Sequence, residues 1–275
     1  MHDMNRRDFI NASGGAIAAG AMMPESAQGE PGALSRSVEF PHAAPGKRRI
    51  VAYGAGYNPP FIKFITGLIG KTRPKLCYLP TASADGEGGI IRWYETCASL
   101  SVEPYVQRMF IDSYHQKKSF EEVLLDMDAI VVGGGNTLNM MAIWKAQGVD
   151  KILKQAWDKG IVLAGGSAGS LCWFEEGTTD SRPKELSKVE CLGFIKTSHC
   201  PHYDAEEQRR PLYQKYILDK TLKPGYAIDN KAAIYFEDNE VKKVLAVNEE
   251  SNAYYVSVKD GKIVEEKLPK EVVGE

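Results

Sequence analysis

The segment GGSAG at residues 165–169 constrains the fold more than any other part of the chain. It follows the apolar run at residues 161–164 and precedes a stretch with helical character. A Gly-X-Ser-X-Gly sequence in this setting predicts a tight strand-to-helix turn, in which the flanking residues must be small and the serine backbone is strained. Such a turn presents the Ser167 hydroxyl at the end of a sheet, as a nucleophile elbow does. The pentapeptide alone also fits a phosphate-binding turn or a plain chain reversal, so the rest of the sequence must decide.

From Arg48 onward, short apolar runs alternate with longer amphipathic segments. This pattern predicts an α/β fold with a mostly parallel sheet and helices on both faces. The predicted strands cover residues 49–53, 75–79, 103–110, 128–132, 161–165 and 190–196, and the predicted helices cover 60–70, 87–99, 118–126, 137–146, 149–158 and 168–175. After Pro224 only strands are expected, at 226–228, 232–237, 241–247, 253–258 and 262–266. The Asp260-Gly261 pair between the last two predicts a hairpin, so the C-terminal edge is rich in β-structure.

Composition is that of an ordinary soluble globular protein. The chain has 275 residues, of which 43% are hydrophobic and 25% charged, and a net charge of −2. Lysine and arginine are scattered, so a nucleic-acid partner is not expected. Five cysteines without a close CxxC pair predict neither a disulfide framework nor a zinc ribbon, and free buried thiols are expected.

The first 47 residues differ from the rest. Arg6-Arg7 is followed by a mildly apolar, Gly- and Ala-rich stretch that is too short to anchor the chain stably in a membrane, and then by a linker-like segment. This order predicts a twin-arginine export signal over residues 1–47, ahead of a single domain at 48–275. The expected location is periplasmic or extracellular. A basic, unstructured N-terminus on a cytoplasmic protein is the alternative.

A second glycine-rich turn, VVGGGNT at residues 131–137, follows another predicted strand. It places backbone N–H groups at the same sheet end with no side chain in the way. An acyl-transfer site needs such donors for the developing oxyanion. One donor is expected from Ala168 and the other from Gly134 or Gly135, while an ordinary strand-to-helix turn is the alternative.

A nucleophilic serine needs a base, and the chain offers five histidines. His2 and His42 lie in the N-terminal segment, and His115 lies in a polar loop. His199 and His202 follow an apolar strand, and spacing alone does not choose between them. His199, Cys200 and His202 match no familiar zinc pattern, so no metal site is predicted.

The chain resembles the peptidase E and cyanophycinase family of serine peptidases, which has the flavodoxin-like fold of class I glutamine amidotransferases. The resemblance rests on five motifs in the family's order: VVGGGNT (131–137), GGSAG (165–169), TTD (178–180), CPHYD (200–204) and AIDNKAAIYF (227–236). It implies that Ser167 is the nucleophile, His202 the base and Asp180 the acid of a triad. Glu175, Glu176 and Asp204 are alternatives for the acid. No cofactor is implied.

The resemblance also implies a small peptide or amide as substrate, contacted by Asn136, Glu206 and Arg209. In peptidase E an arginine is expected to hold an aspartyl carboxylate, and Glu206 stands at that place here. A carboxylate repels an N-terminal aspartate, so a strictly aspartyl dipeptidase is not expected. An amidase or acyl transferase using the same serine, and a silent ligand-binding module of the same fold, are the other interpretations.

Overall fold

The computed structural model describes residues 46–56, 59–110 and 113–274. Nearly all of the predicted export signal and linker lies outside these ranges. No helix within them has both the length and the apolar character needed to cross a bilayer.

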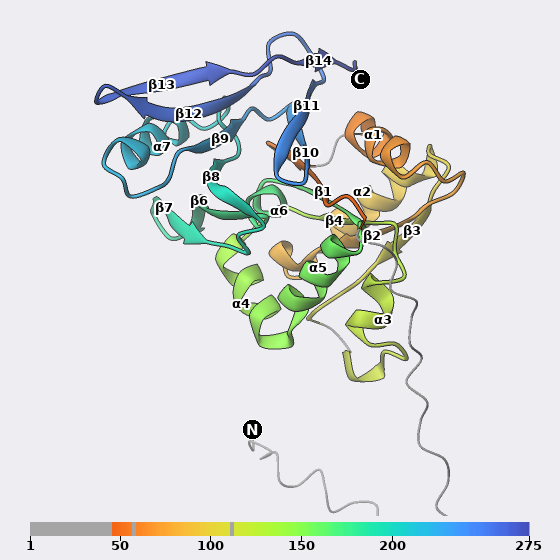
Figure 1. Ribbon diagram of the computed structural model, residues 1–275. Helices are drawn as coiled ribbons and strands as arrows, with labels where there is room; N and C mark the ends of the chain where they lie inside the picture. The colour runs from red at the N-terminus through yellow and green to blue at the C-terminus, as the bar shows by residue number, and fades with distance from the viewer. Residues whose placement is uncertain (1–45, 57–58, 111–112, 275) are drawn as a thin grey trace, which may run out of the picture. The chain divides into compact units, whose positions relative to one another are not determined.

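The larger sheet has eight strands, and five neighbouring strands form its central parallel part (Figure 1). In spatial order the parallel strands are β1 (Arg49–Tyr53), β5 (Val162–Gly166), β4 (Ala129–Val132), β2 (Lys75–Leu79) and β3 (Glu103–Val106). Three further strands continue beyond β1, namely β10 (Ala232–Glu237), β11 (Glu240–Ala246) and β14 (Glu271–Val272). Because β4 and β5 are parallel neighbours, the turns that follow them meet at the same edge of the sheet.

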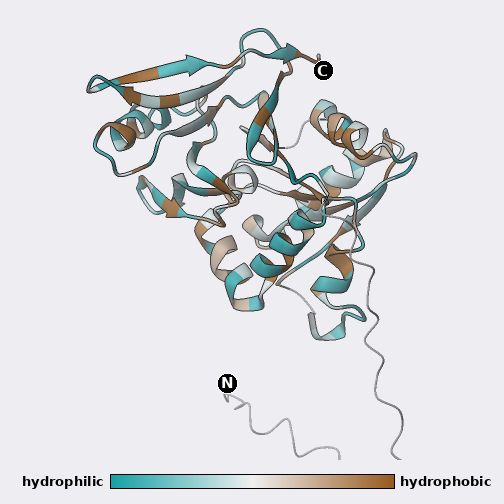
Figure 2. Ribbon diagram, in the orientation of Figure 1, coloured by the Kyte–Doolittle hydropathy of each residue, from teal (hydrophilic) through white to brown (hydrophobic). Residues whose placement is uncertain are grey.

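Helices cover both faces of this sheet (Figure 1). One face packs against α1 (Pro59–Ile69) and α2 (Glu87–Ala98), and the other against α3 (Phe120–Leu124), α4 (Thr137–Gln147) and α5 (Val149–Asp158). Two short 3₁₀ turns are η1 (Thr81–Ser83) and η2 (Ser113–His115). Alternate strand residues enter the two cores: Val51 packs toward α1, and Ala52 packs on the opposite side. Figure 2 shows brown residues in the central strands and many teal residues along α5.

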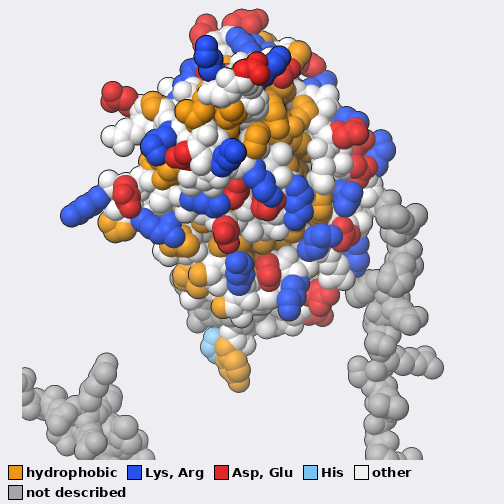
Figure 3. Space-filling view, turned by 60° about the vertical axis from the view of Figure 1, so that its left-hand side comes forward, with side chains coloured by type: hydrophobic (Ala, Val, Ile, Leu, Met, Phe, Trp, Pro, Cys, Tyr) orange, Lys and Arg blue, Asp and Glu red, His pale blue; other side chains and the backbone are white. Residues whose placement is uncertain are grey.

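The smaller sheet has six strands. In spatial order they are β13 (Lys262–Lys267), β12 (Ala253–Lys259), β9 (Gly225–Ile228), β8 (Ile195–Cys200), β6 (Phe174–Arg182) and β7 (Glu185–Glu190). Helix α7 (Arg209–Leu218) connects β8 to β9 and packs on this sheet through the core that contains Tyr203 and Tyr213. Charged side chains of both signs are interspersed over the face of the molecule in Figure 3.

The chain passes from the first sheet to the second through α6 (Ala168–Leu171), a helix of a single turn. The passage is so crowded that side chains have no room. A Cβ on Gly166 would lie 1.8 Å from the Ala55 carbonyl oxygen, and one on Gly169 would lie 2.1 Å from the Val132 carbonyl oxygen. Small residues around Ser167 are therefore a packing requirement of the passage between the sheets.

The α/β fold predicted from the sequence is confirmed. The five parallel strands and helices α1 to α5 lie where the alternation predicts them, as do the strands after Pro224 and the hairpin at Asp260-Gly261. The five cysteines are free, and all but Cys191 are fully buried.

Three local predictions are wrong. The helix predicted at 168–175 ends at Leu171, and its remainder begins β6. The strand predicted at 190–196 is the end of β7 and the start of β8. Helix α7 was not predicted, although Pro211 lies in its first turn, where proline is tolerated because the N–H groups have no partner in the helix.

We predict that Gly169→Ala destabilises the protein by about 1 to 3 kcal/mol, because the new methyl meets rigid backbone of β4. Gly67→Ala is the matched control: Gly67 lies exposed in α1 with nothing near its Cβ position, so alanine there raises stability by about 0.5 to 1 kcal/mol. Urea denaturation of the two variants measures both changes. Equal stabilities would contradict the steric argument.

Candidate active site

Ser167 lies at the turn between β5 and α6, with φ 58° and ψ −121°. A positive φ is uncommon in residues other than glycine and costs about 1 to 3 kcal/mol, and such residues cluster at functional sites. The Ser167 N–H donates to the Tyr53 carbonyl at 3.3 Å, and its carbonyl accepts the N–H groups of Ser170 and Leu171. The backbone is thus held in the strained conformation from both sides. The strand, turn and helix predicted from GGSAG are all present.

His202 lies just beyond β8, and it too has a positive φ, of 56°. Its Nε2 atom lies 2.8 Å from Ser167 Oγ. Both side chains are half-buried. The pair therefore joins the end of a strand in the larger sheet to the end of a strand in the smaller one. Spacing alone did not choose between His199 and His202, and in the structure it is His202 that contacts Ser167.

The other ring nitrogen of His202, Nδ1, lies 2.7 Å from Oδ1 of Asn230. An amide oxygen only accepts, so Nδ1 carries the proton and Nε2 is free to accept from the Ser167 hydroxyl. Asn230 is itself held by Asp204, whose Oδ1 accepts the Asn230 N–H at 2.8 Å. The four residues form one chain of hydrogen bonds.

Asn230 is a site residue that was not predicted from the sequence. It lies within the AIDNKAAIYF motif, where a polar pair, Asp229-Asn230, directly follows strand β9 and could have indicated it. No pattern of spacing links it to His202, because the two residues meet only through the parallel pairing of β8 and β9.

The prediction that Asp180 contacts His202 needs correction. The Asp180 side chain is 64% exposed, and its carboxylate lies 3.6 Å from the Arg209 guanidinium. The physical reason is that residues 174–182 form strand β6, so Asp180 follows the buried pair Thr178 and Thr179 toward the exposed end of that strand.

The alternative acids behave differently. Glu175 accepts from Lys223 Nζ, and Glu176 accepts from the Lys223 N–H, so neither is at the histidine. Asp204 is the one alternative acid that joins the site, and it does so through Asn230.

The residues predicted to bind substrate are all engaged in hydrogen bonds within the protein. Arg209 is 2% exposed; its guanidinium bonds both oxygens of Glu206, at 2.7 and 3.2 Å, and the Thr178 carbonyl. With Asp180 close by, its charge is already matched. Asn136 caps α4 by accepting the Asn139 N–H, and its amide donates to the Ser181 carbonyl. None of these three residues lines the hollow beside Ser167.

The glycine turn after β4 lies against the serine. A Cβ on Gly134 would sit 3.1 Å from Ser167 Cβ. The Gly133 N–H donates to Leu79 and the Asn136 N–H to Ala82, whereas the N–H groups of Gly134 and Gly135 have no backbone acceptor within the described ranges. Ala168 is the first residue of α6, so its N–H has no acceptor in a preceding turn. The three predicted oxyanion donors therefore have N–H groups without a backbone acceptor; Gly134 lies against Ser167, whereas the atoms nearest Gly135 belong to Ala82 and Ser83.

A small hollow of about 280 Å³ adjoins this turn. Its lining residues come from the end of β4 and the glycine turn after it, the end of β5, the segment from η1 into α2, strand β2 and the residues that follow β1: Gly56, Tyr78, Ser83, Gly86, Gly88, Gly89, Arg92, Val132, Gly133, Gly134 and Gly166. Among the described residues that line the hollow, Arg92 is the one with a charged side chain. No acidic residue is in this lining, so no carboxylate there neutralises the Arg92 guanidinium.

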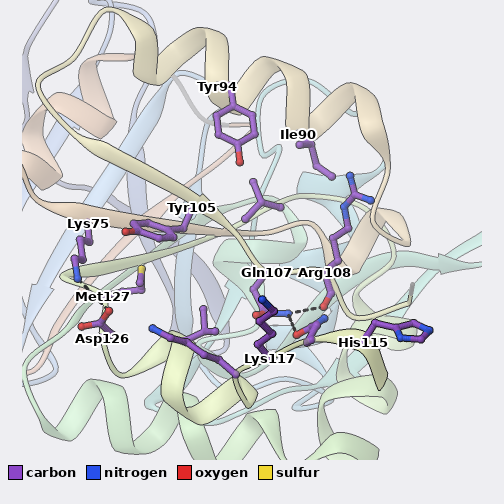
Figure 4. A pocket seen from close by; sticks show the side chains of 14 residues that line it. Lys75, Ile90, Tyr94, Tyr105, Gln107, Arg108, His115, Lys117, Asp126 and Met127 are labelled. Atoms are coloured by element: carbon purple, nitrogen blue, oxygen red, sulfur yellow. Dashed lines mark hydrogen bonds and ion pairs between the residues drawn. The ribbon is translucent and has the colours of Figure 1, made fainter. Parts of the chain in front are cut away.

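A larger hollow of about 930 Å³ lies elsewhere, along the outer edge of β3 (Figure 4). Figure 4 shows its walls: Tyr94 and Ile90 of α2, Tyr105 of β3, and Lys117 and His115 beyond it. Ser167, His202 and Asn230 line neither hollow. The smaller hollow, however, borders Gly134, which lies against Ser167, and Gly166, its neighbour in the chain, whereas the larger one borders neither. Among the described residues, no group of three or more His, Cys, Asp or Glu side chains is placed to hold a metal ion.

Comparison with known proteins gives a consistent result. The family described as Peptidase family S51 matches residues 51–244. The chain is 38% identical over 233 residues to a Bacillus subtilis protein named uncharacterized peptidase YgaJ, covering 82% of this chain and 100% of that protein. It is 25% identical over 194 residues to peptidase E of Shewanella denitrificans, covering 66% and 79% of the two chains. The crystal structure of a peptidase from an acI-B1 Actinobacterium has the same fold, with a TM-score of 0.62 at 18% identity over 82% of this chain and 95% of that one.

Asp229, next to Asn230, generates a pH prediction. It is 4% exposed, and burial raises its pKa from 3.8 to about 6. Between these values the folded protein holds a proton that the unfolded chain has lost, so stability falls as pH rises through the window and is level above it. Asp229→Asn removes this loss, and relative to the parent the variant gains up to about 3 kcal/mol between pH 4 and 6.

Urea denaturation from about pH 2 to 6 measures the difference and also covers the pH window of the control. Asp219→Asn is the control of opposite sign: hydrogen bonds from Thr221 lower the pKa of exposed Asp219 to about 2, so its stabilisation is present above 3.8 and fades as pH falls toward 2. A constant gap between parent and Asp229→Asn at all pH values would refute the assignment.

Proposed function

The chain belongs to peptidase family S51 and is a serine-type peptidase, and on this premise we propose that it hydrolyses small peptides through Ser167, His202 and Asn230. The observation that carries the proposal is the 2.8 Å contact between Ser167 Oγ and His202 Nε2 at a strained strand-to-helix turn. Nucleophile, base and an orienting group on the second ring nitrogen are the parts that acyl transfer by a serine requires.

In the proposed mechanism, Nε2 of His202 takes the Ser167 proton as Oγ attacks the substrate carbonyl. Asn230 holds the Nδ1 proton, which keeps the imidazole in the required tautomer. The carbon–nitrogen bond then breaks, the leaving amine receives the proton from Nε2, and the acyl group stays on Ser167. Water, deprotonated by the same nitrogen, releases the acid.

The N–H groups of Ala168 and of Gly134 or Gly135 are proposed to hold the oxyanion of the tetrahedral intermediate. Each well-placed donor of this kind is worth about 3 to 4 kcal/mol of transition-state stabilisation. Their role needs no side chain. This agrees with a turn in which a side chain at Gly134 would press on Ser167.

The hollow beside Gly134 is proposed to hold the acyl residue of the substrate. Its volume of about 280 Å³ fits one amino-acid residue rather than a chain, which favours a dipeptide or similarly short substrate. Arg92 at its wall favours a carboxylate on that residue. Glu206, which the sequence suggested would repel such a group, is paired with Arg209 away from this wall.

We predict that Ser167→Ala and His202→Ala each lower kcat by roughly 10³-fold or more, and that Asn230→Ala lowers it by roughly 10- to 10³-fold with KM little changed, because the imidazole loses its tautomer. Asp180→Asn is expected to leave kcat near that of the parent, since Asp180 contacts Arg209 and not His202. Steady-state assays with a dipeptide library measure these effects.

A fluorophosphonate probe that labels reactive serines separates the alternatives. Labelling that is lost in Ser167→Ala supports an enzyme, and an intact protein that resists the probe indicates a binding module. Turnover of amides but not of dipeptides indicates an amidase or transferase. Loss of activity in Asp180→Asn but not in Asn230→Ala would overturn the proposed triad.

We predict that Arg92→Ala lowers kcat/KM for dipeptides with an acidic acyl residue by roughly 10- to 100-fold, the worth of about 1.5 to 3 kcal/mol for a charged hydrogen bond. The kcat/KM for dipeptides with alanine as the acyl residue should change little. Arg73→Ala, which removes an exposed arginine that does not line the hollow, is the matched control. Equal losses on both substrates would argue against this recognition.

A further inference from the structure

A second serine–histidine contact lies one helical turn beyond the nucleophile. Ser170 of α6 has its Oγ 2.9 Å from Nε2 of His199 on β8, and 2.8 Å from the Ser167 carbonyl oxygen. The two contacts share one spacing: Ser167 meets His202, and Ser170, three residues later, meets His199, three residues earlier. His199 on β8 and His202 in the loop that follows therefore both contact the segment that carries the nucleophile.

His199 is fixed on all sides. Its Nδ1 lies 2.9 Å from the Tyr226 carbonyl of β9, and its ring stacks on Phe174 with centroids 4.4 Å apart. A carbonyl only accepts, so Nδ1 carries the proton and Nε2 presents a lone pair. Burial lowers the pKa of His199 to about 3, which keeps the ring neutral.

The Ser170 hydroxyl has one proton and two nearby acceptors. The Ser167 carbonyl already accepts two backbone N–H groups, from Ser170 at 3.1 Å and Leu171 at 2.9 Å. The lone pair of His199 has Ser170 as its one donor among the described residues. Leaving a buried acceptor without a donor costs about 1 to 3 kcal/mol, so the Ser170 proton goes to His199.

Neither Ser170 nor His199 has any exposed surface, so neither meets substrate. Their effect must pass through α6. A helix of one turn has little stability of its own and depends on tertiary contacts. On one side, Gly169 lies against the backbone of β4; on the other, Ser170 is tied to His199.

We propose that His199 is a positioning residue for the nucleophile. Through Ser170 it fixes the first turn of α6, and with it the strained backbone of Ser167 and the direction of the Ala168 N–H. This inference rests on the proposed function, in which Ser167 attacks and Ala168 donates to the oxyanion.

The test compares Ser170→Ala, His199→Leu and the double variant. Ser198→Ala is the matched control, because it too removes a buried hydroxyl. Ser198 lies on β8 and its hydroxyl bonds the Tyr213 hydroxyl at 2.7 Å, not α6. Each full-length protein is assayed for its rate of labelling by a fluorophosphonate probe, for kcat and KM on a dipeptide, and for its thermal unfolding midpoint.

We expect Ser170→Ala to lower the labelling rate and kcat by roughly 10- to 100-fold with KM unchanged, because misplacement of a reacting group by about 1 Å costs up to about 10²-fold. The double variant should be no worse than the worse single variant, since both break one contact. Ser198→Ala should lose thermal stability but keep its labelling rate.

Labelling of Ser170→Ala at the parent rate, or a loss no larger than that of Ser198→Ala, would overturn the inference. So would additive effects of the two substitutions. If His199→Leu does not fold, Ser170→Ala against Ser198→Ala still decides. A parent protein that resists the probe would instead refute the proposed function, so the two failures are told apart.

Discussion

The crossing of the chain from one sheet to the other at α6 is the constraint on which the site depends. Backbone meets backbone there without any intervening side chain, at Gly166 against Ala55 and at Gly169 against Val132. This contact holds the end of β5 beside the ends of β8 and β9. Ser167 comes from one sheet, and His202 and Asn230 from the other, so the hydrogen bond between serine and histidine is also a bond between sheets.

Charges are distributed so that the centre of the site stays nearly neutral. The group that orients His202 is an amide, and the nearest carboxylate in that chain, Asp204, acts through the backbone of Asn230. Arg209, the buried cation, is matched by Glu206 and Asp180. Arg92 is therefore the charge left for a ligand beside the glycine turn, which is why a substrate preference is assigned to it rather than to Arg209.

The sequence predicts what depends on local pattern. Short continuous apolar runs locate the parallel strands, which are buried on both faces. Gly-X-Ser-X-Gly locates the elbow, because the tight turn requires small residues beside the serine and these are visible in the local sequence. Asn230 and the true environment of Asp180 escape prediction for the opposite reason. They depend on the pairing of β6, β8 and β9, and on strand β6 at residues 174–182, whose start was predicted as the end of a helix at 168–175 and whose remainder was given no element.

One segment, from η1 into the start of α2, contributes five residues to the wall of the small hollow: Ser83, Gly86, Gly88, Gly89 and Arg92. That segment contributes no atom to the serine, the histidine or the asparagine, and it belongs to neither of the strands that carry them. In the proposed function, the residues that select the substrate and the residues that cleave it therefore come from separate segments of the chain. Exchange of this one segment between related proteins would then change the substrate preference while leaving Ser167, His202 and Asn230 unchanged.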